Sequence, residues 1–236
     1  MERIFIISKQ KCGTTSTAQF LEDHGITVAR ADGWHNRLWS LLHFAGKHEE
    51  IFSSQRFNEF RAYEDEPWWM SNIFDRILSK FPDSKFILLK RNKDEWFDSL
   101  KKYLNNRPHY SVIHALEYPR TEEYHMYLSA NRRLLRNHSM KIDESHRALY
   151  TQYFEDYHDE INAKIKKAGR EEQLFTADLS DADKWVRLGE FLNIQVPADY
   201  SVHANRASAS QSHQENLLQQ AYRDIKWVLR ECMSKK

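Results

Sequence analysis

The feature of this sequence that most constrains its fold is a short apolar run, Ile4–Ile7, which leads into a polar loop containing Gly13. A continuous apolar run of this length is typical of a strand that is buried on both faces of a parallel sheet. The residues after the glycine, Thr14–Asp23, have a helical pattern, and Gly25 stands where a C-terminal cap is expected. In such a strand, loop and helix, backbone N–H groups can converge on an anion at the helix N-terminus. The loop Lys9–Ser16 is therefore predicted to bind an anionic group.

Strand and helix signals alternate along the rest of the chain, and the strongest strand signal is Lys85–Lys90. Other strands are expected at residues 26–29, 61–63 and 174–177, and helices at residues 71–81, 121–140, 143–169, 185–192 and 217–229, with helices and loops at 34–60. This order predicts an α/β chain with a three-layer P-loop-type fold, in which helices flank a central parallel sheet. We expect one domain over residues 1–236, with a mostly helical insertion at about residues 103–170.

The composition argues against several classes of function. The 35 Lys and Arg residues nearly balance the 34 Asp and Glu residues, so we expect no nucleic-acid partner. The opening Met1–Ile7 is too short for a signal-peptide core, and no segment approaches the ~20 apolar residues of a membrane span. We therefore expect a cytoplasmic protein without a membrane partner. Its 2 cysteines, Cys12 and Cys232, lack metal-type spacing and are expected to be reduced thiols.

The order of residues in the loop argues against an ordinary nucleoside-triphosphate site. The common triphosphate loop ends in Gly-Lys followed by Ser or Thr, whereas here Lys11 precedes Gly13 and Thr14 follows it. A kinase or NTPase is kept as an alternative, with Asp178 as the candidate acidic residue for Mg²⁺. A second alternative is a noncatalytic nucleotide-binding module, because turnover can be lost while a nucleotide fold persists.

Two motifs resemble those of the sulfotransferases that use 3′-phosphoadenosine 5′-phosphosulfate (PAPS) as donor. The family's 5′-phosphosulfate loop reads Lys-x-Gly-Thr-Thr after the first strand, and Lys11–Thr15 matches it residue for residue. The family's second signature is a strand followed by Arg and, eight residues later, by Ser, which together hold the 3′-phosphate. Arg91 and Ser99 follow the strand at Lys85–Lys90 with that spacing, since 99 − 91 = 8. The chain thus resembles PAPS-dependent sulfotransferases at two places, in the order that the family has.

A third similarity lies nearer the C-terminus. Trp185–Ile194, followed by Pro197, is similar to the family's Trp-x-x-Leu-x-x-Phe-Leu segment, so the resemblance spans residues 3 to about 205. Many cytosolic members have Trp directly after Gly-Thr-Thr to stack on the adenine, whereas this chain has Ser16. It also lacks an Arg-Lys-Gly motif near its C-terminus. The chain is therefore more similar to the bacterial or carbohydrate-type members of the family.

The resemblance implies which residues would hold the donor: Lys11, Cys12, Gly13, Thr14, Thr15, Ser16, Arg91 and Ser99. Sulfuryl transfer depends on in-line positioning and charge stabilisation, so Lys11 is the expected catalytic cation at the bridging oxygen. Lys9, which lies outside the motif, is expected to be exposed. No metal is expected, because the 12 His residues include no His-Glu-x-x-His pattern and no Cys pair has zinc spacing.

A general base has to take the proton of the acceptor, and members of this family place a His or a carboxylate after a middle strand, often two residues before Pro. Asp65 matches that position ahead of Pro67, and Glu64 and Glu66 are its neighbours. His203, in a His-x-Asn similar to one found in some relatives, is a further candidate. The acceptor stays open: a hydroxyl or an amine on a small molecule or a carbohydrate fits the resemblance. The sequence does not indicate the oligomeric state.

Overall fold

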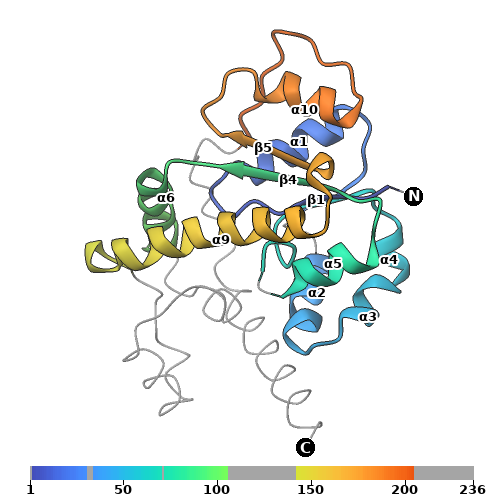
Figure 1. Ribbon diagram of the computed structural model, residues 1–236, viewed down its shortest axis with the longest axis horizontal. Helices are drawn as coiled ribbons and strands as arrows, with labels where there is room; N and C mark the ends of the chain where they lie inside the picture. Colours follow the sequence, from blue (N-terminus) through green and yellow to red (C-terminus); the bar gives the residue numbers. More distant parts are fainter. Residues whose placement is uncertain (1, 31–33, 71, 106–141, 205–236) are drawn as a thin grey trace, which may run out of the picture. The chain divides into compact units, whose positions relative to one another are not determined.

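The computed structural model describes residues 2–30, 34–70, 72–105 and 142–204 (Figure 1). The chain divides into two compact units. The first comprises Met1–Asn92 and His158–Ser208, and the second comprises Lys93–Tyr157 and Ala209–Lys236. The helices predicted at residues 121–140 and 217–229, and most of the predicted insertion, lie outside the described residues. The single domain therefore stays a prediction.

The first unit is built on a five-stranded sheet in which every neighbouring pair of strands is parallel. Its strands are β1 (Ile4–Ile6), β2 (Val28–Ala29), β3 (Ala62–Tyr63), β4 (Lys85–Lys90) and β5 (Leu174–Asp178). The strand order is β2-β3-β1-β4-β5, which puts β1 in the centre. The predicted parallel α/β fold is confirmed. β2 is shorter than its apolar pattern predicted, since its pairing with β3 begins only at Val28.

One face of the sheet is covered by α1 (Thr14–Asp23) and α10 (Lys184–Leu192) (Figure 1). Ile4 and Ile6, which alternate along β1, are completely buried in the core on this face. With them pack Ala18, Phe20 and Leu21 of α1 and Trp185, Leu188 and Leu192 of α10. The rings of Phe20 and Trp185 stack with centroids 5.4 Å apart, so the two helices meet over the sheet.

The opposite face carries a layer of aromatic side chains. Phe5 of β1 stacks on Tyr63 of β3 with ring centroids 4.8 Å apart, and Phe57 stacks on Tyr63 at 4.5 Å. The rings of Trp39 and Trp68 lie 5.5 Å apart in the same layer. The helices on this side are α2 (Trp34–Phe44), α3 (His48–Phe52), α4 (Gln55–Asn58) and α5 (Ile73–Lys80). Helices on both faces make the unit three-layered, as the alternation of strands and helices predicted.

The second unit contains α6 (Lys93–Asn105) and the part of α9 (Arg147–Lys167) up to Tyr157. Trp96 of α6 stacks on Phe154 of α9 with ring centroids 4.4 Å apart. The sequence predicted one helix from residue 143 to 169, whereas the structure begins with a separate 3-10 turn at Glu144–His146. The turn forms because the Asp143 side chain accepts the Ser145 N–H at 3.0 Å and caps it. A second short 3-10 turn, Glu171–Gln173, precedes β5 in the first unit.

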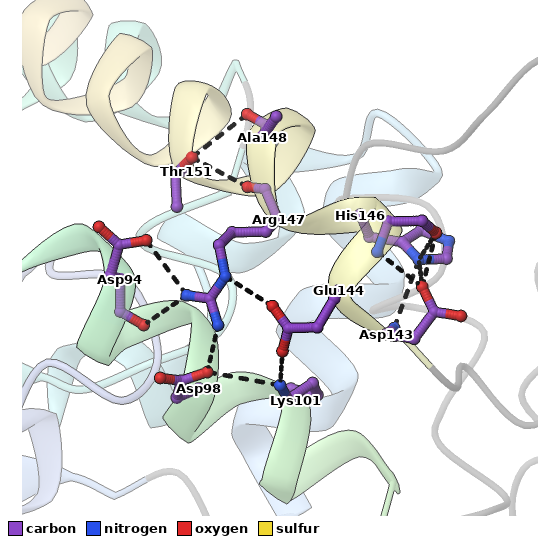
Figure 2. A network of polar contacts seen from close by, with 10 residues as sticks. Asp94, Asp98, Lys101, Asp143, Glu144, His146, Arg147, Ala148 and Thr151 are labelled. Carbon is purple, nitrogen blue, oxygen red and sulfur yellow. Dashed lines mark hydrogen bonds and ion pairs between the residues drawn. The ribbon is translucent and has the colours of Figure 1, made fainter.

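A surface network of charges joins α6 to the start of α9 (Figure 2). Arg147 donates to Asp98 at 2.6 Å, to Asp94 at 3.1 Å and to Glu144 at 2.7 Å. Lys101 also contacts Glu144. Hydrogen bonds from Arg147 and then Lys101 lower the pKa of Glu144 to about 2. Exposed pairs of this kind add little stability one by one, so the main effect of the network is to orient the two helices.

Strands β1 and β4 stay connected beyond the last residue of β1. The Ile7 N–H donates to the Ile87 carbonyl at 3.0 Å. The buried hydroxyl of Ser8 then accepts the Leu89 N–H at 2.7 Å and donates to the Ile87 carbonyl at 3.3 Å. A side chain thus takes over the pairing where the backbone of the loop leaves the sheet.

Ser8→Ala is expected to lower the free energy of unfolding by about 1–3 kcal/mol, because the buried Leu89 N–H loses its acceptor. Urea unfolding followed by circular dichroism measures this change. Ser201→Ala is the matched control, since Ser201 is exposed and surface substitutions of this kind usually stay within about 0.5 kcal/mol. Equal midpoints for the two variants would contradict the role of the Ser8 hydroxyl.

Candidate functional site

Three loops meet at one edge of the sheet in the first unit. They follow the carboxyl ends of β1, β3 and β4, which are neighbours in the strand order. The β1–β4 pairing is parallel, with Ile6 opposite Ile87. Because the carboxyl ends of parallel strands lie at the same edge, the fold brings Lys9–Ser16, Glu64–Met70 and Arg91 there. Ligands of open parallel sheets bind at that edge.

Gly13 begins α1 in the left-handed conformation, with φ 78° and ψ 20°. Residues with a Cβ rarely adopt this conformation, and a Cβ on Gly13 would lie 2.6 Å from Cδ1 of Leu179. Lys11 is also left-handed, with φ 68°, and is partly exposed. The Gly13 carbonyl accepts the N–H of Thr17 at 2.9 Å and its hydroxyl at 3.0 Å. The N–H groups in the first turn of α1 lack acceptors within the helix, as at any helix start, and can bind an anion.

Cys12 and Arg91 show that the loop and the end of β4 influence one another. Cys12 is completely buried, so its side chain belongs to the core and its backbone is what a donor could contact. Burial raises the pKa of the Cys12 thiol to about 12, while the charges of Arg91 and Lys9 act in the opposite direction. The charge of Arg91, which follows β4, therefore acts on a residue of the loop. The structure thus places the loop and Arg91, the two candidate anion-binding groups of the sequence, at the same edge of the sheet.

Lys9 differs from the sequence-based expectation. Only 1% of the residue is exposed, and its ammonium lies 4.6 Å from the ring centroid of Trp69. A cation removed from water needs compensation, and the face of an aromatic ring supplies part of it. The prediction of an exposed Lys9 is wrong, because Trp69, from the loop after β3, covers its side chain.

Asp65 follows β3 and has a left-handed backbone, with φ 63°. Its Oδ1 accepts the Nε1–H of Trp69 at 2.8 Å, and part of the residue remains exposed. Burial of the carboxyl group raises the pKa of Asp65 to about 7, and the charges of Glu66 and Glu64 add to the rise. Hydrogen bonds from Trp69 and Gln10 act in the opposite direction on that pKa. A carboxyl group with such a pKa is about half ionised at neutral pH and can accept a proton there.

The two acidic neighbours of Asp65 have different surroundings. Glu64 is only 1% exposed, and its Oε2 lies 3.6 Å from Nε of Arg30, which directly follows β2. Glu66 is partly exposed and accepts a hydrogen bond from Nε2 of Gln10 at 3.2 Å. The carboxyl groups of Glu64 and Glu66 thus lie against different partners, Arg30 and Gln10.

Ser16, a predicted donor-binding residue, holds another segment of the chain. Its hydroxyl accepts the Ala204 N–H at 3.1 Å and donates to the Ala204 carbonyl at 3.4 Å. These bonds attach residues 201–204 to the first turn of α1. His203, the remaining candidate base, lies in this segment and is exposed. The Ser16 hydroxyl is thus already engaged by the backbone.

Two further candidates belong to other elements. Ser99 lies on α6 in the second unit and is partly exposed. Asp178, the candidate magnesium ligand of a kinase, ends β5, which β4 separates from β1.

Among the residues that the structure describes, no group of three or more His, Cys, Asp and Glu side chains is arranged to hold a metal ion. None of the described helices combines the length and the apolar character that crossing a bilayer requires.

Sequence reasoning missed Trp69, Gln10 and Arg30, each of which contacts a candidate residue. One signal for Trp69 was present, because two consecutive Trp residues in a charged stretch need burial. No local pattern could identify the role of Gln10, since it bonds to a residue 56 positions away in the chain.

Comparison with known proteins identifies the family. The family model described as sulfotransferase domain matches residues 3–210. No curated protein matches the chain. The crystal structure of a sulfotransferase from Alicyclobacillus acidocaldarius matches with a TM-score of 0.50 and 14% identity, over 97% of this chain and 94% of that one. At this identity the structural match shows the fold alone. Because the family match covers most of the sequence, the chain belongs to the sulfotransferase family.

Proposed function

We propose that this protein transfers the sulfuryl group of PAPS to a hydroxyl or amine acceptor. Membership of the sulfotransferase family supports sulfuryl transfer. The observation that carries the donor assignment is that Lys11–Thr15 and Arg91 follow neighbouring parallel strands, β1 and β4. PAPS has anionic groups at both its 5′ and its 3′ positions, so it needs two anion-binding groups at one edge of the sheet.

In the proposed complex the 5′-phosphosulfate binds the loop, where Gly13 permits a close approach of the backbone and α1 presents its N-terminal N–H groups. The loop residues assigned to it are Lys11, Cys12, Gly13, Thr14, Thr15 and Ser16. Arg91 offers a planar fork to the 3′-phosphate, and Ser99 is proposed to add a hydroxyl to it. The loop and Arg91 would then hold two different parts of one nucleotide.

In the proposed reaction the acceptor oxygen or nitrogen attacks sulfur in line with the bond from sulfur to the bridging oxygen. The new bond forms as that bond breaks, and the Lys11 ammonium stabilises the negative charge that develops on the bridging oxygen. Asp65 takes the proton of the acceptor. The products are 3′-phosphoadenosine 5′-phosphate (PAP), the sulfated acceptor and the proton held by Asp65. The proposed step uses no metal ion.

We propose a small-molecule or carbohydrate acceptor, and neither nucleic acid nor a membrane as a partner. The near balance of 35 basic and 34 acidic residues supports this choice, because a polyanionic partner would favour an excess of positive charge. A cytoplasmic location is proposed as well, since Cys12 is a free thiol and the cytoplasm keeps thiols reduced.

Calorimetric titration tests the class of donor. We expect PAP to bind more tightly than ATP with Mg²⁺, because the lysine of the loop precedes its glycine and Arg91 is proposed to bind a 3′-phosphate. Adenosine 5′-phosphosulfate, which lacks the 3′-phosphate, is the matched control, and it should bind more weakly than PAPS by about 1.5–3 kcal/mol. Tighter binding of ATP with Mg²⁺ would favour the kinase or NTPase alternative.

Substitution of the two basic residues should separate catalysis from donor binding. Lys11→Ala is expected to lower kcat by about 10²-fold or more, because the bridging oxygen loses its stabilising charge. Arg91→Ala should mainly weaken PAP binding, by about 1.5–3 kcal/mol. Steady-state kinetics and PAP titration measure the two effects, with Lys166→Ala, an exposed lysine of α9, as control. Near-normal kinetics in both variants would rule out this site.

The pH dependence tests Asp65 as the base. Because its pKa is raised to about 7, kcat/KM of the wild type should fall as the pH drops below 7. Asp65→Asn should remove this limb and lower the rate by about 10²–10⁴-fold. The folded state also binds the Asp65 proton more tightly than the unfolded chain, so the contribution of Asp65 to stability is lost as the pH rises from 3.8 towards 7, and wild type minus Asp65→Asn measures it. A limb that survives in Asp65→Asn and disappears in Glu66→Gln, Glu64→Gln or His203→Ala would reassign the base.

A further inference from the structure

Trp69 contacts two charged groups through two different parts of its indole ring. Its Nε1–H, at the edge of the ring, donates to Oδ1 of Asp65 at 2.8 Å. Its face lies 4.6 Å from the ammonium of Lys9. Lys9 comes from the loop after β1 and Asp65 from the loop after β3, so one side chain links the two loops. Both loops carry residues of the proposed site.

The indole is held firmly enough to act as a fixed support. Trp69 is completely buried, and a close-packed interior leaves a ring of this size little freedom to change rotamer. The turn that carries it is closed by two backbone hydrogen bonds, from Trp68 N–H to the Asp65 carbonyl and from Met70 N–H to the Pro67 carbonyl, both at 2.9 Å. The position of Asp65 relative to the ring is therefore set by local backbone geometry as well as by packing.

The bond from Trp69 affects the proton affinity of Asp65. A hydrogen bond donated to a carboxylate favours its charged form, so Trp69 opposes the rise that burial, Glu66 and Glu64 cause in the pKa of Asp65. Gln10, from the loop after β1, acts in the same direction as Trp69.

The charged groups around Asp65 have partners as well. Arg30, which follows β2, faces Glu64 at 3.6 Å, and Gln10 donates to Glu66 at 3.2 Å. The Nε1–H of Trp69 thus donates to Asp65 from within the same turn, and the side chain that carries it is completely buried.

The ring face has a separate role at Lys9. The ammonium has almost no access to water, and the π-face of an indole attracts a cation without neutralising its charge. That charge acts on Cys12 in the donor loop. A positive charge kept at the start of the loop can attract an anionic donor.

We propose that Trp69 is a positioning residue, which orients the Asp65 carboxylate with its indole N–H and holds the Lys9 ammonium at the start of the donor loop with its ring face. This inference rests on the proposed function, since it assigns Asp65 as the base and the loop as the donor site. It adds two residues, Trp69 and Lys9, to those that the loop and strand motifs identify.

Trp69→Phe separates the two contacts, because phenylalanine keeps a ring face and loses the N–H. We expect the acidic limb of the pH–rate profile to move upward by about one pH unit, the effect of removing one hydrogen bond to a charged group. The Kd for PAP should change by less than about threefold, since the ring face persists. A limb that stays in place would overturn the positioning role.

Trp68→Phe is the matched control. Trp68 is the preceding residue of the same turn and is also completely buried, and no described residue accepts a hydrogen bond from its Nε1. The same substitution there alters the packing of the aromatic layer without removing a bond to Asp65. Trp68→Phe should therefore leave the acidic limb where it is. Equal shifts in the two variants would show that packing alone is responsible and would overturn the inference.

Lys9→Met tests the ring-face contact, because methionine keeps an unbranched side chain of similar length and loses the charge. We expect PAP to bind about tenfold more weakly, through the loss of one nearby positive charge. Trp69→Leu, which removes both the N–H and the ring, should show the weaker PAP binding and the shifted limb together. Unchanged PAP affinity in Lys9→Met would overturn the role of Lys9.

A direct measurement keeps the inference testable without catalysis or variants of Trp69. In the wild-type protein with ¹⁵N-labelled tryptophan, the Nε1–H resonance of Trp69 should shift with a midpoint near pH 7 and should not do so in Asp65→Asn. The Trp68 resonance serves as the internal reference. A flat Trp69 resonance in the wild type would overturn the inference even if sulfuryl transfer is found. Conversely, a titrating resonance in a protein that neither binds PAP nor transfers sulfate would overturn the proposed function and leave the Trp69–Asp65 contact standing.

Discussion

Strands β1 and β4 are paired along the length of β1, and the Ser8 hydroxyl extends the pairing to Leu89 where the backbone of the loop turns away. This pairing fixes the position of the start of the loop relative to the end of β4. The loop reaches Gly13 and α1 from one side of the junction, and Arg91 follows β4 on the other. The two candidate anion-binding groups come to one edge because a parallel ladder keeps their strands in register. The third loop arrives at the same edge since β3 pairs with the opposite side of β1.

The edge that results contains several charged groups with little access to water. Lys9 and Glu64 are each 1% exposed, and each lies against a partner, the Trp69 ring and the Arg30 guanidinium. Burial of a charge is costly unless such a partner is present, so the arrangement selects one packing of the loops. The same desolvation raises the pKa of Asp65 into the neutral range. The Trp69 side chain takes part in both effects, since its ring covers Lys9 and its Nε1–H bonds to Asp65.

Membership of the sulfotransferase family leaves room for features particular to this chain. Ser16, which directly follows the Gly-Thr-Thr of the loop, binds the backbone of Ala204. A small side chain at this position allows residues 201–204 to lie against the first turn of α1. The hydroxyl of Tyr200 also donates to Asp23 at 2.6 Å, at the last turn of the same helix. Residues 200–204 are therefore bonded to both the first and the last turn of α1.

Local patterns were enough to determine the elements that carry the motifs. The bounds of β4 and α1 agree with their predictions, because an unbroken apolar run and a helix ended by Gly25 are decided by neighbouring residues. The parallel order of strands and helices then placed Gly13 and Arg91 at one edge without reference to coordinates. Only the tertiary structure decided that Lys9 is buried, that Trp69 holds Asp65, and that Leu179 closes over Gly13. The contacts of Lys9 with Trp69 and of Gly13 with Leu179 join residues far apart in the chain, and no periodicity along a sequence records which distant side chain fills a given space. Trp69 and Asp65 lie only four residues apart, but their bond depends on the folded turn that carries both of them.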